Sequence, residues 1–262
     1  MIVAIPVPTD WPEQSVRLVD EDITRNVRFT TYDVLDDGVK RMILNIPQVS
    51  PGEEVRGLVT LEVTTRKILA PEDTTIFEID KRPPRELRRY LGTSPFIDSR
   101  HSSIRRKAKE FEDDDATAWE HVEKIYDWVR ENINQDNEEM KGAVQAMRDG
   151  SGHAEDLVNV FVALCRASDV PARFVWVQGH YYAEFYLVDD EGQGHWFPCQ
   201  LAGNREFGSM SDTRPILQKG DNIRVPEKDV PQRYVPEIVK GKRKRNSGVP
   251  QVKFVRELLP DQ

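Results

Sequence analysis

A glycine-containing turn that leads into an apolar helix constrains the fold of this 262-residue sequence more than any other feature. Gly150 and Gly152 allow a sharp turn directly before residues 154–167. One stripe of that segment carries Leu157, Phe161, Leu164 and Ala167, and Val158, Val162 and Cys165 widen it. Pro171 ends the pattern, and a strand begins near Arg173. A helix that is apolar nearly all round is typical of a buried position, so this segment is predicted to lie inside a core.

A second helix is predicted upstream, where Thr117 and Glu120 have the spacing of a capping box. In this arrangement each side chain satisfies a free N–H group at the helix start. The apolar residues behind the box recur at helical spacing and form one face: Val122, Ile125, Tyr126, Val129 and Ile133. Trp128 lies off this face and is expected to contact another element.

Strands are predicted on both sides of these helices. After Pro171, the runs 173–178, 181–188 and 195–198 are strands, with 189–192 as the hairpin between the last two. Residues 2–98 are mostly β, because 27–33, 40–47 and 56–65 alternate and turn residues fall at 36–38 and 50–52. Such short strands predict an antiparallel β-sandwich-like domain, whose role is packing, orientation or partner contact.

Composition excludes several classes of protein. The formal net charge of −8 argues against a general nucleic-acid binder, and the basic run 240–245 is expected to be a solvated surface segment. No run reaches the roughly 18 apolar residues of a membrane helix, so no membrane span is expected. Two cysteines make neither a disulfide framework nor a zinc site. The start of the chain has no visible signal peptide, which fits a cytoplasmic protein or an exported one whose leader was removed.

Three stretches resemble the transglutaminase-like superfamily, whose members are relatives of papain-type cysteine proteases. Residues 150–173 follow the family pattern Gly-x-Cys-x-Asp, apolar helix, Gly-Ile-Pro-Ala-Arg, with Ala154 at the cysteine position. The run 180–186, His-Tyr-Tyr-Ala-Glu-Phe-Tyr, is similar to the family strand His-Ala-Trp-Val-Glu-Val-Tyr. The run 196–200, Trp-Phe-Pro-Cys-Gln, is similar to Trp-x-Pro-x-Asp. The resemblance spans roughly residues 100–205 and is looser, to bacterial multidomain members, elsewhere.

The resemblance implies an α+β fold with a cysteine-protease-like core. Together with the strand pattern it predicts a β-rich N-terminal domain over residues 1–98 and a transglutaminase-like domain over 99–214. Residues 215–262, rich in Pro and Lys, are predicted to be an extended arm packed on the core. The family chemistry is cysteine-dependent amide hydrolysis or acyl transfer, without a cofactor.

The catalytic positions implied by the resemblance are Ala154 for the nucleophile, His180 for the base and Gln200 for the orienting acid. A methyl group cannot attack a carbonyl, and a neutral amide stabilises an imidazolium less well than a carboxylate. Cys165 is expected to pack in the core, and alternation points Cys199 away from Gln200. Ser151 lies on the turn, but nothing in the sequence activates it.

A binding site is predicted around these positions. His153, Tyr182, Trp196 and Glu184 are its expected lining residues, since His180, Tyr182, Glu184 and Tyr186 share one face of a strand. No metal is expected. His153, Glu155, Asp156 and His180 lack ligand spacing, and Asp156 is better placed to complement the helix dipole.

Three functions stay open at this point. The first is a non-catalytic protein that binds a peptide or an amide-containing ligand. The second is an active amidase, peptidase or acyltransferase whose cysteine was replaced by Ala154. The third is a structural or assembly module. The sequence alone determines neither the ligand nor the oligomeric state.

Overall fold

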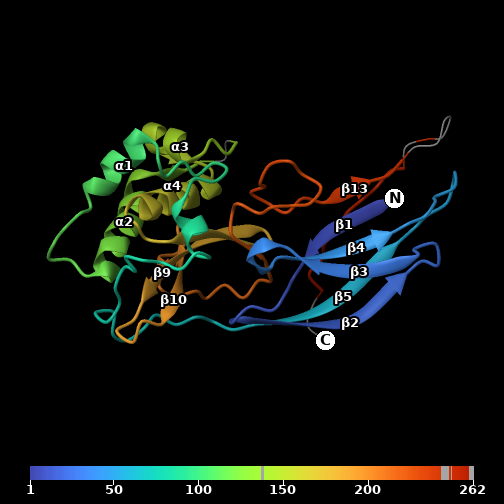
Figure 1. Ribbon diagram of the computed structural model, residues 1–262, viewed down its shortest axis with the longest axis horizontal. Coiled ribbons are helices and arrows are strands. Elements are labelled where there is room, and N and C mark those ends of the chain that lie inside the picture. The colour runs from blue at the N-terminus through green and yellow to red at the C-terminus, as the bar shows by residue number, and fades with distance from the viewer. Residues whose placement is uncertain (137–138, 243–247, 249, 260–262) are drawn as a thin grey trace.

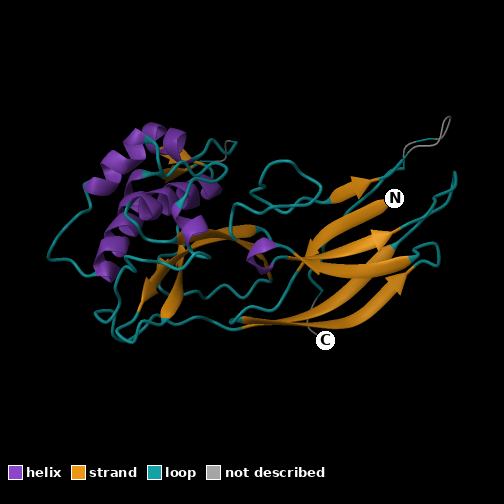
Figure 2. Ribbon diagram, in the orientation of Figure 1, coloured by secondary structure: helices purple, strands orange, loops and turns teal. Residues whose placement is uncertain are grey.

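The computed structural model describes residues 1–136, 139–242, 248 and 250–259. Figure 1 shows an elongated molecule with the helices and a five-stranded sheet at one end and two smaller sheets at the other. Figure 2 shows that helices α1 to α4 all lie at the first end. These two parts are called the helical region and the N-terminal β-region below.

The five-stranded sheet of the helical region is antiparallel, in the order β11-β10-β9-β8-β12. Its strands are β8 (Ala172–Val177), β9 (His180–Val188), β10 (Gly194–Gln200), β11 (Glu206–Phe207) and β12 (Ile216–Lys219). β8, β9 and β10 confirm the three strands predicted after Pro171. β12 was not predicted, because Pro215 and the lysines around it resemble a loop in composition.

Of the four α-helices in the described chain, α4 packs on β8 and β9, and the other three pack against α4. The four helices are α1 (Ser102–Lys109), α2 (Ala118–Asn132), α3 (Ala143–Asp149) and α4 (Ala154–Ala167). Residues 155–166 of α4 are all buried, which confirms the prediction of a helix inside the core. A short parallel pair, β6 (Asn134–Gln135) and β7 (Ser151–Gly152), joins the end of α2 to the start of α4.

The predicted start of α2 is confirmed. Glu120 N donates to Thr117 Oγ1 at 3.2 Å, and Thr117 N donates to Glu120 Oε2 at 2.8 Å. All five residues of the predicted apolar face are buried. Trp128 contacts Phe111, with ring centroids 5.9 Å apart, and the Lys107 ammonium lies 4.7 Å from the Trp128 ring.

The N-terminal β-region contains two antiparallel sheets. The first has the order β13-β1-β4-β3 and is built from β1 (Ile2–Val7), β3 (Phe29–Val34), β4 (Lys40–Asn45) and β13 (Ile238–Lys240). The second pairs β2 (Gln14–Ile23) with β5 (Gly57–Thr65). Buried apolar residues of the first sheet, among them Met42 and Leu44, pack against Val59 and Leu61 of the second. The predicted antiparallel N-terminal region is therefore present.

The predicted β-structure ends earlier than residue 98. After β5 the chain runs as loops, with the 3-10 helix η2 (Arg88–Leu91); another 3-10 turn, η1 (Asp36–Gly38), precedes β4. Isolated bridges join Ile68 to Met210 and Glu78 to Val188, so this segment packs along the five-stranded sheet. Its Pro residues and charged residues give it no continuous alternation.

The C-terminal part links both regions. β12 is an edge strand of the five-stranded sheet, and β13 pairs with β1 of the N-terminal β-region. Gln14 fixes the junction, since its Nε2 donates to Ile216 O at 3.0 Å and its Oε1 accepts from Ile216 N at 2.6 Å. Residues 243–245 of the basic run lie outside the described residues. In the part of the chain that is described, no helix has the length and apolar character to cross a bilayer.

Candidate functional site

The start of α4 carries Ala154 as its first helical residue, directly after the cap residue His153. His153 Nδ1 accepts a hydrogen bond from Glu155 N at 3.3 Å, and Asp156 Oδ2 accepts one from His153 N at 3.1 Å. This reciprocal pair fixes the first turn of the helix, as a capping box does. Among the described residues, no group accepts a hydrogen bond from the Ala154 N–H, as is usual for a donor in a first turn.

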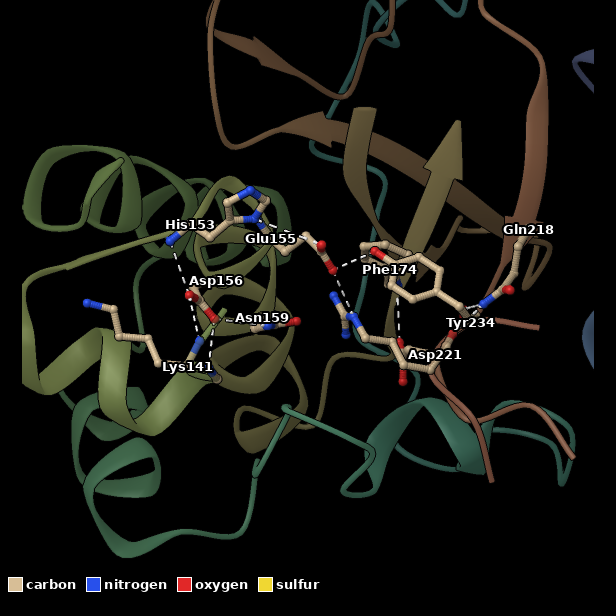
Figure 3. Close-up of polar contacts among 12 residues, drawn as sticks. Lys141, His153, Glu155, Asp156, Asn159, Phe174, Gln218, Asp221 and Tyr234 are labelled. Atoms are coloured by element: carbon tan, nitrogen blue, oxygen red, sulfur yellow. Dashed lines mark hydrogen bonds and ion pairs between the residues drawn. The ribbon is translucent and has the colours of Figure 1, made fainter. Parts of the chain in front are cut away.

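Asp156 has a wider role than the predicted complement to the helix dipole. Its carboxylate is fully buried and also accepts from Gly142 N at 2.7 Å and Lys141 N at 3.1 Å. Figure 3 shows Asp156 between His153 and Lys141. The side chain therefore ties the loop before α3 to the start of α4.

His180 and Gln200 form a direct pair. His180 is the first residue of β9 and Gln200 the last of β10, and His180 Nε2 lies 2.8 Å from Gln200 Oε1. Because an amide oxygen only accepts, His180 Nε2 is the donor of this hydrogen bond. The sequence-predicted base and the residue at the acid position are thus brought together, with an amide in place of a carboxylate.

Two residues of α2 hold the end of β10 in place. Tyr126 OH donates to Gln200 O at 2.8 Å, and Arg130 NH1 donates to the same oxygen at 3.0 Å. The Arg130 guanidinium also donates to Leu201 O and Gly203 O, at 3.1 and 2.8 Å. Sequence reasoning placed Tyr126 on the buried face of α2, but it gave no sign that these side chains position Gln200.

The aromatic side chain of Tyr181 lies near both the start of α4 and the start of β9. The Tyr181 ring lies 6.4 Å from the His153 ring and 6.5 Å from the His180 ring, measured between centroids. Tyr181 also stacks on Phe174 of β8 at 5.6 Å. The start of α4 and the start of β9 are therefore neighbours, with His153, Tyr181 and His180 all partly exposed.

The other predicted lining residues lie elsewhere. Tyr182 and Glu184 are 2% and 1% exposed, and loop residues Trp11, Ile68 and Met210 belong to the apolar cluster around Tyr182. Tyr182 packs in an apolar cluster, and Glu184 forms ion pairs with Arg173 and Lys219. Trp196, in contrast, is partly exposed; the Arg173 guanidinium lies 3.9 Å from its ring, and Tyr90 and Tyr186 contact its edges. Burial leaves Tyr182 and Glu184 no open surface at which to meet a ligand.

A buried polar cluster behind the first turn of α4 was missed by sequence reasoning. Glu155 Oε2 accepts from Tyr234 OH at 2.5 Å and from Arg233 Nε at 3.2 Å, as Figure 3 shows for Glu155 and Tyr234. Nearby, Asp221 accepts two hydrogen bonds from Arg166. The partners are more than 50 residues apart in sequence, so no local pattern signals them. They anchor α4 to the C-terminal part of the chain.

Neither cysteine is placed for nucleophilic chemistry. Cys165 and Cys199 are fully buried, and burial raises the pKa of both thiols well above its usual range. A thiol kept protonated and out of solvent is a poor nucleophile. Among the described residues there is also no cluster of three His, Cys, Asp or Glu side chains arranged to hold a metal.

Comparison with known proteins agrees with this architecture. The model of the transglutaminase-like superfamily core matches residues 105–201. Protein png-1 of Neurospora crassa is 41% identical over 61 residues, which are 23% of this chain and 15% of that protein. The chain thus spans only a small part of that relative.

A solved structure shows the same fold. The crystal structure of a candidate cysteine protease from Cytophaga hutchinsonii superposes with a TM-score of 0.60 at 15% identity, covering 84% of this chain and 75% of the other. Its likeness extends beyond the matched core into the N-terminal β-region, since it covers most of the chain. Residues 105–201, which contain Ala154, His180 and Gln200, are a domain of the transglutaminase-like superfamily.

Proposed function

We propose that this protein is a non-catalytic member of the superfamily that binds an amide-containing peptide at the start of α4. The observation that carries the proposal is that Ala154 occupies the first position of α4 while His180 and Gln200 stay paired at 2.8 Å. The surroundings of a nucleophile are present, and the nucleophile is absent.

The loss of catalysis follows from the side chains available. Acyl transfer in this family needs a thiolate, and Ala154 supplies only a methyl group. The chain has two cysteines, and both are buried with raised pKa values. Neither Cys165 nor Cys199 replaces the missing group.

Binding of an amide fits the polar groups that remain. The Ala154 N–H is a donor at a helix start and suits a ligand carbonyl oxygen. With Nε2 of His180 donating to Gln200, Nδ1 in the neutral form of the ring is an acceptor and suits a ligand N–H. One donor and one acceptor match the two polar groups of a peptide bond, and the partly exposed ring of Tyr181 adds apolar contact.

The binding site is tested by titrating N-acetyl-glutaminyl-glycine amide into ¹⁵N-labelled protein. Ala154→Pro removes the N–H donor at a position where helices accept proline. His153 has φ −59° and ψ 157°, which is compatible with a following proline. We expect Ala154→Pro and His180→Ala each to weaken binding about tenfold, the effect of about 1.4 kcal/mol from one lost hydrogen bond.

The control is Glu191→Gln in the exposed β9–β10 hairpin, which should bind the probe as the parent does. Equal binding by all four proteins would refute a site at α4. Amidase activity of the parent chain that disappears in His180→Ala would refute the non-catalytic assignment.

The intact His180–Gln200 pair also favours the second function, an active relative whose cysteine has been replaced. Ala154→Cys tests it directly. Fast, His180-dependent labelling by iodoacetamide at neutral pH means that the site still activates a thiol. Labelling no faster than that of the parent chain means that the site has lost this capacity and binding is its remaining role.

A further inference from the structure

A large apolar groove lies in the N-terminal β-region, away from the α4 site. Its volume is about 2150 Å³. Val3 and Ile5 of β1 and Met42 and Leu44 of β4 line one side, and residues 57–63 of β5 line the other. The second sheet has only two strands, so it leaves part of the apolar face of the four-stranded sheet uncovered.

The groove is bordered by a strand with one unpaired edge. In the described chain, β5 pairs with β2 and with no other strand. An unpaired edge presents free N–H and C=O groups and is a template for another extended chain. Apolar walls beside such an edge are the setting in which proteins bind peptides by strand addition.

The C-terminal segment, defined here as residues 250–259, runs along this groove. It forms no strand and pairs with none of the described strands, so the free edge of β5 stays unpaired. Its apolar residues are poorly covered: Val255 is 52% exposed, and Leu258 and Leu259 are 56% and 63% exposed. Two of its side chains are partly buried, Phe254 and Arg256, and Phe254 is the apolar one.

The segment also fits the groove imperfectly at Arg256. Its NH1 pairs with Glu237 at 3.0 Å, and its guanidinium lies 5.7 Å from the Trp176 ring. Its Nε and NH2 atoms are buried without a hydrogen-bond partner. Buried donors without partners destabilise a contact, so a better-matched chain should displace this segment.

We propose that the groove is a docking site for an extended apolar peptide of another protein, which adds as a strand beside β5. The C-terminal segment occupies the site in its absence as a displaceable substitute. The segment shows what the site accepts, namely a partly buried aromatic residue at the position of Phe254. Arg256, with its unpaired donors, marks the position at which another peptide can fit better. This site stands apart from the proposed function of α4 and does not depend on it.

The test uses a fluorescent peptide with the sequence of residues 250–259 as the probe. In the parent chain, the attached segment competes at high effective concentration, so the probe should bind weakly. Phe254→Asp in the full chain releases the attached segment, and the probe should then bind at least about tenfold more tightly. Val255→Asp, which changes an exposed residue of the same segment, should behave as the parent does.

A second measurement changes the probe and not the protein. In the Phe254→Asp chain, a probe with Asp in place of Phe254 should lose binding, whereas a probe with Asp in place of Val255 should keep it within about threefold. Amide hydrogen exchange should slow along residues 57–63 when the unmodified probe binds, as strand addition requires.

Three outcomes would overturn the proposal. Equal probe binding by the parent and Phe254→Asp chains means that the segment does not occupy the site. Equal binding of the two modified probes means that contact is non-specific. The third outcome is a dimer in analytical ultracentrifugation that the parent chain forms and the Phe254→Asp chain does not. It would mean that the groove holds the C-terminal segment of a second copy.

Discussion

His180 donates from Nε2 to Oε1 of Gln200 across 2.8 Å, joining the first residue of β9 to the last residue of β10. Arg130 and Tyr126 hold the backbone of Gln200 from α2. The pair is therefore positioned by three elements, β9, β10 and α2, and it fixes Nε2 of His180 as the donor.

Gln200→Glu keeps the length of the side chain and adds a negative charge beside His180. In the Ala154→Cys background, this change should speed alkylation by iodoacetamide about fivefold. A carboxylate hydrogen-bonds an imidazolium about 1 kcal/mol more strongly than an amide does. Gln200→Asn, which stays neutral, should give no increase. The rates are measured by mass spectrometry of the labelled peptide.

The two native thiols should be inert until the protein unfolds. Because burial holds the pKa of Cys165 and Cys199 well above its usual range, neither should react with Ellman's reagent in the folded state at pH 7 to 8. Both should react in denaturant. Rapid reaction of either thiol in the folded chain would contradict the described packing and reopen the question of a substitute nucleophile.

Glu184→Gln should destabilise the protein by about 3 to 5 kcal/mol, since it removes the carboxylate partner of Arg173 and leaves the buried Lys219 with Glu13 alone. Glu184 lies 2.6 Å from Arg173 and 2.5 Å from Lys219, and it is 1% exposed. The matched control is Glu62→Gln, which breaks the exposed pair with Arg17 and should cost less than about 1 kcal/mol. Urea unfolding at pH 7 measures both changes.

The same residue predicts a pH dependence. Burial raises the pKa of the Glu184 carboxyl, and the charges of Arg173 and Lys219 outweigh this effect, so the net pKa lies below its ordinary value. A folded-state pKa below the unfolded one means that the stabilisation is complete above about pH 5 and is lost as pH falls through the folded pKa. The stability difference between parent and Glu184→Gln should therefore shrink between pH 5 and the acid limit. A constant difference down to pH 3 would argue against the ion pairs.

Gly152→Ala should destabilise the turn before α4 by about 1 to 3 kcal/mol through overpacking. An added Cβ would lie 2.7 Å from Asp156 Cβ and 3.2 Å from Ala146 Cβ. Gly92→Ala is the control, since its Cβ would have 4.0 Å to the nearest atom. Thermal unfolding of the two variants measures the difference, and equal melting temperatures would show that the turn has more room than described.

Local patterns in the sequence determined the elements that carry the site. The apolar period of residues 154–167 gave α4 with its observed bounds, and the spacing of Thr117 and Glu120 gave the start of α2. These features depend on neighbours along the chain, so they are visible without a fold. The candidate site positions Ala154, His180 and Gln200 are those implied by the resemblance of the motifs around them to the transglutaminase-like superfamily.

Only the tertiary structure decided what surrounds those positions. Strand alternation grouped Tyr182 and Glu184 on one face, but only the packing of loop residues such as Trp11, Ile68 and Met210 shows that this face is buried. Other contacts join residues that are far apart in the chain. Tyr234 donates to Glu155, Arg130 donates to the backbone of Gln200, and the C-terminal segment lines the groove of the N-terminal β-region. Such contacts arise from burial and long-range closure of the chain, which no local sequence pattern encodes.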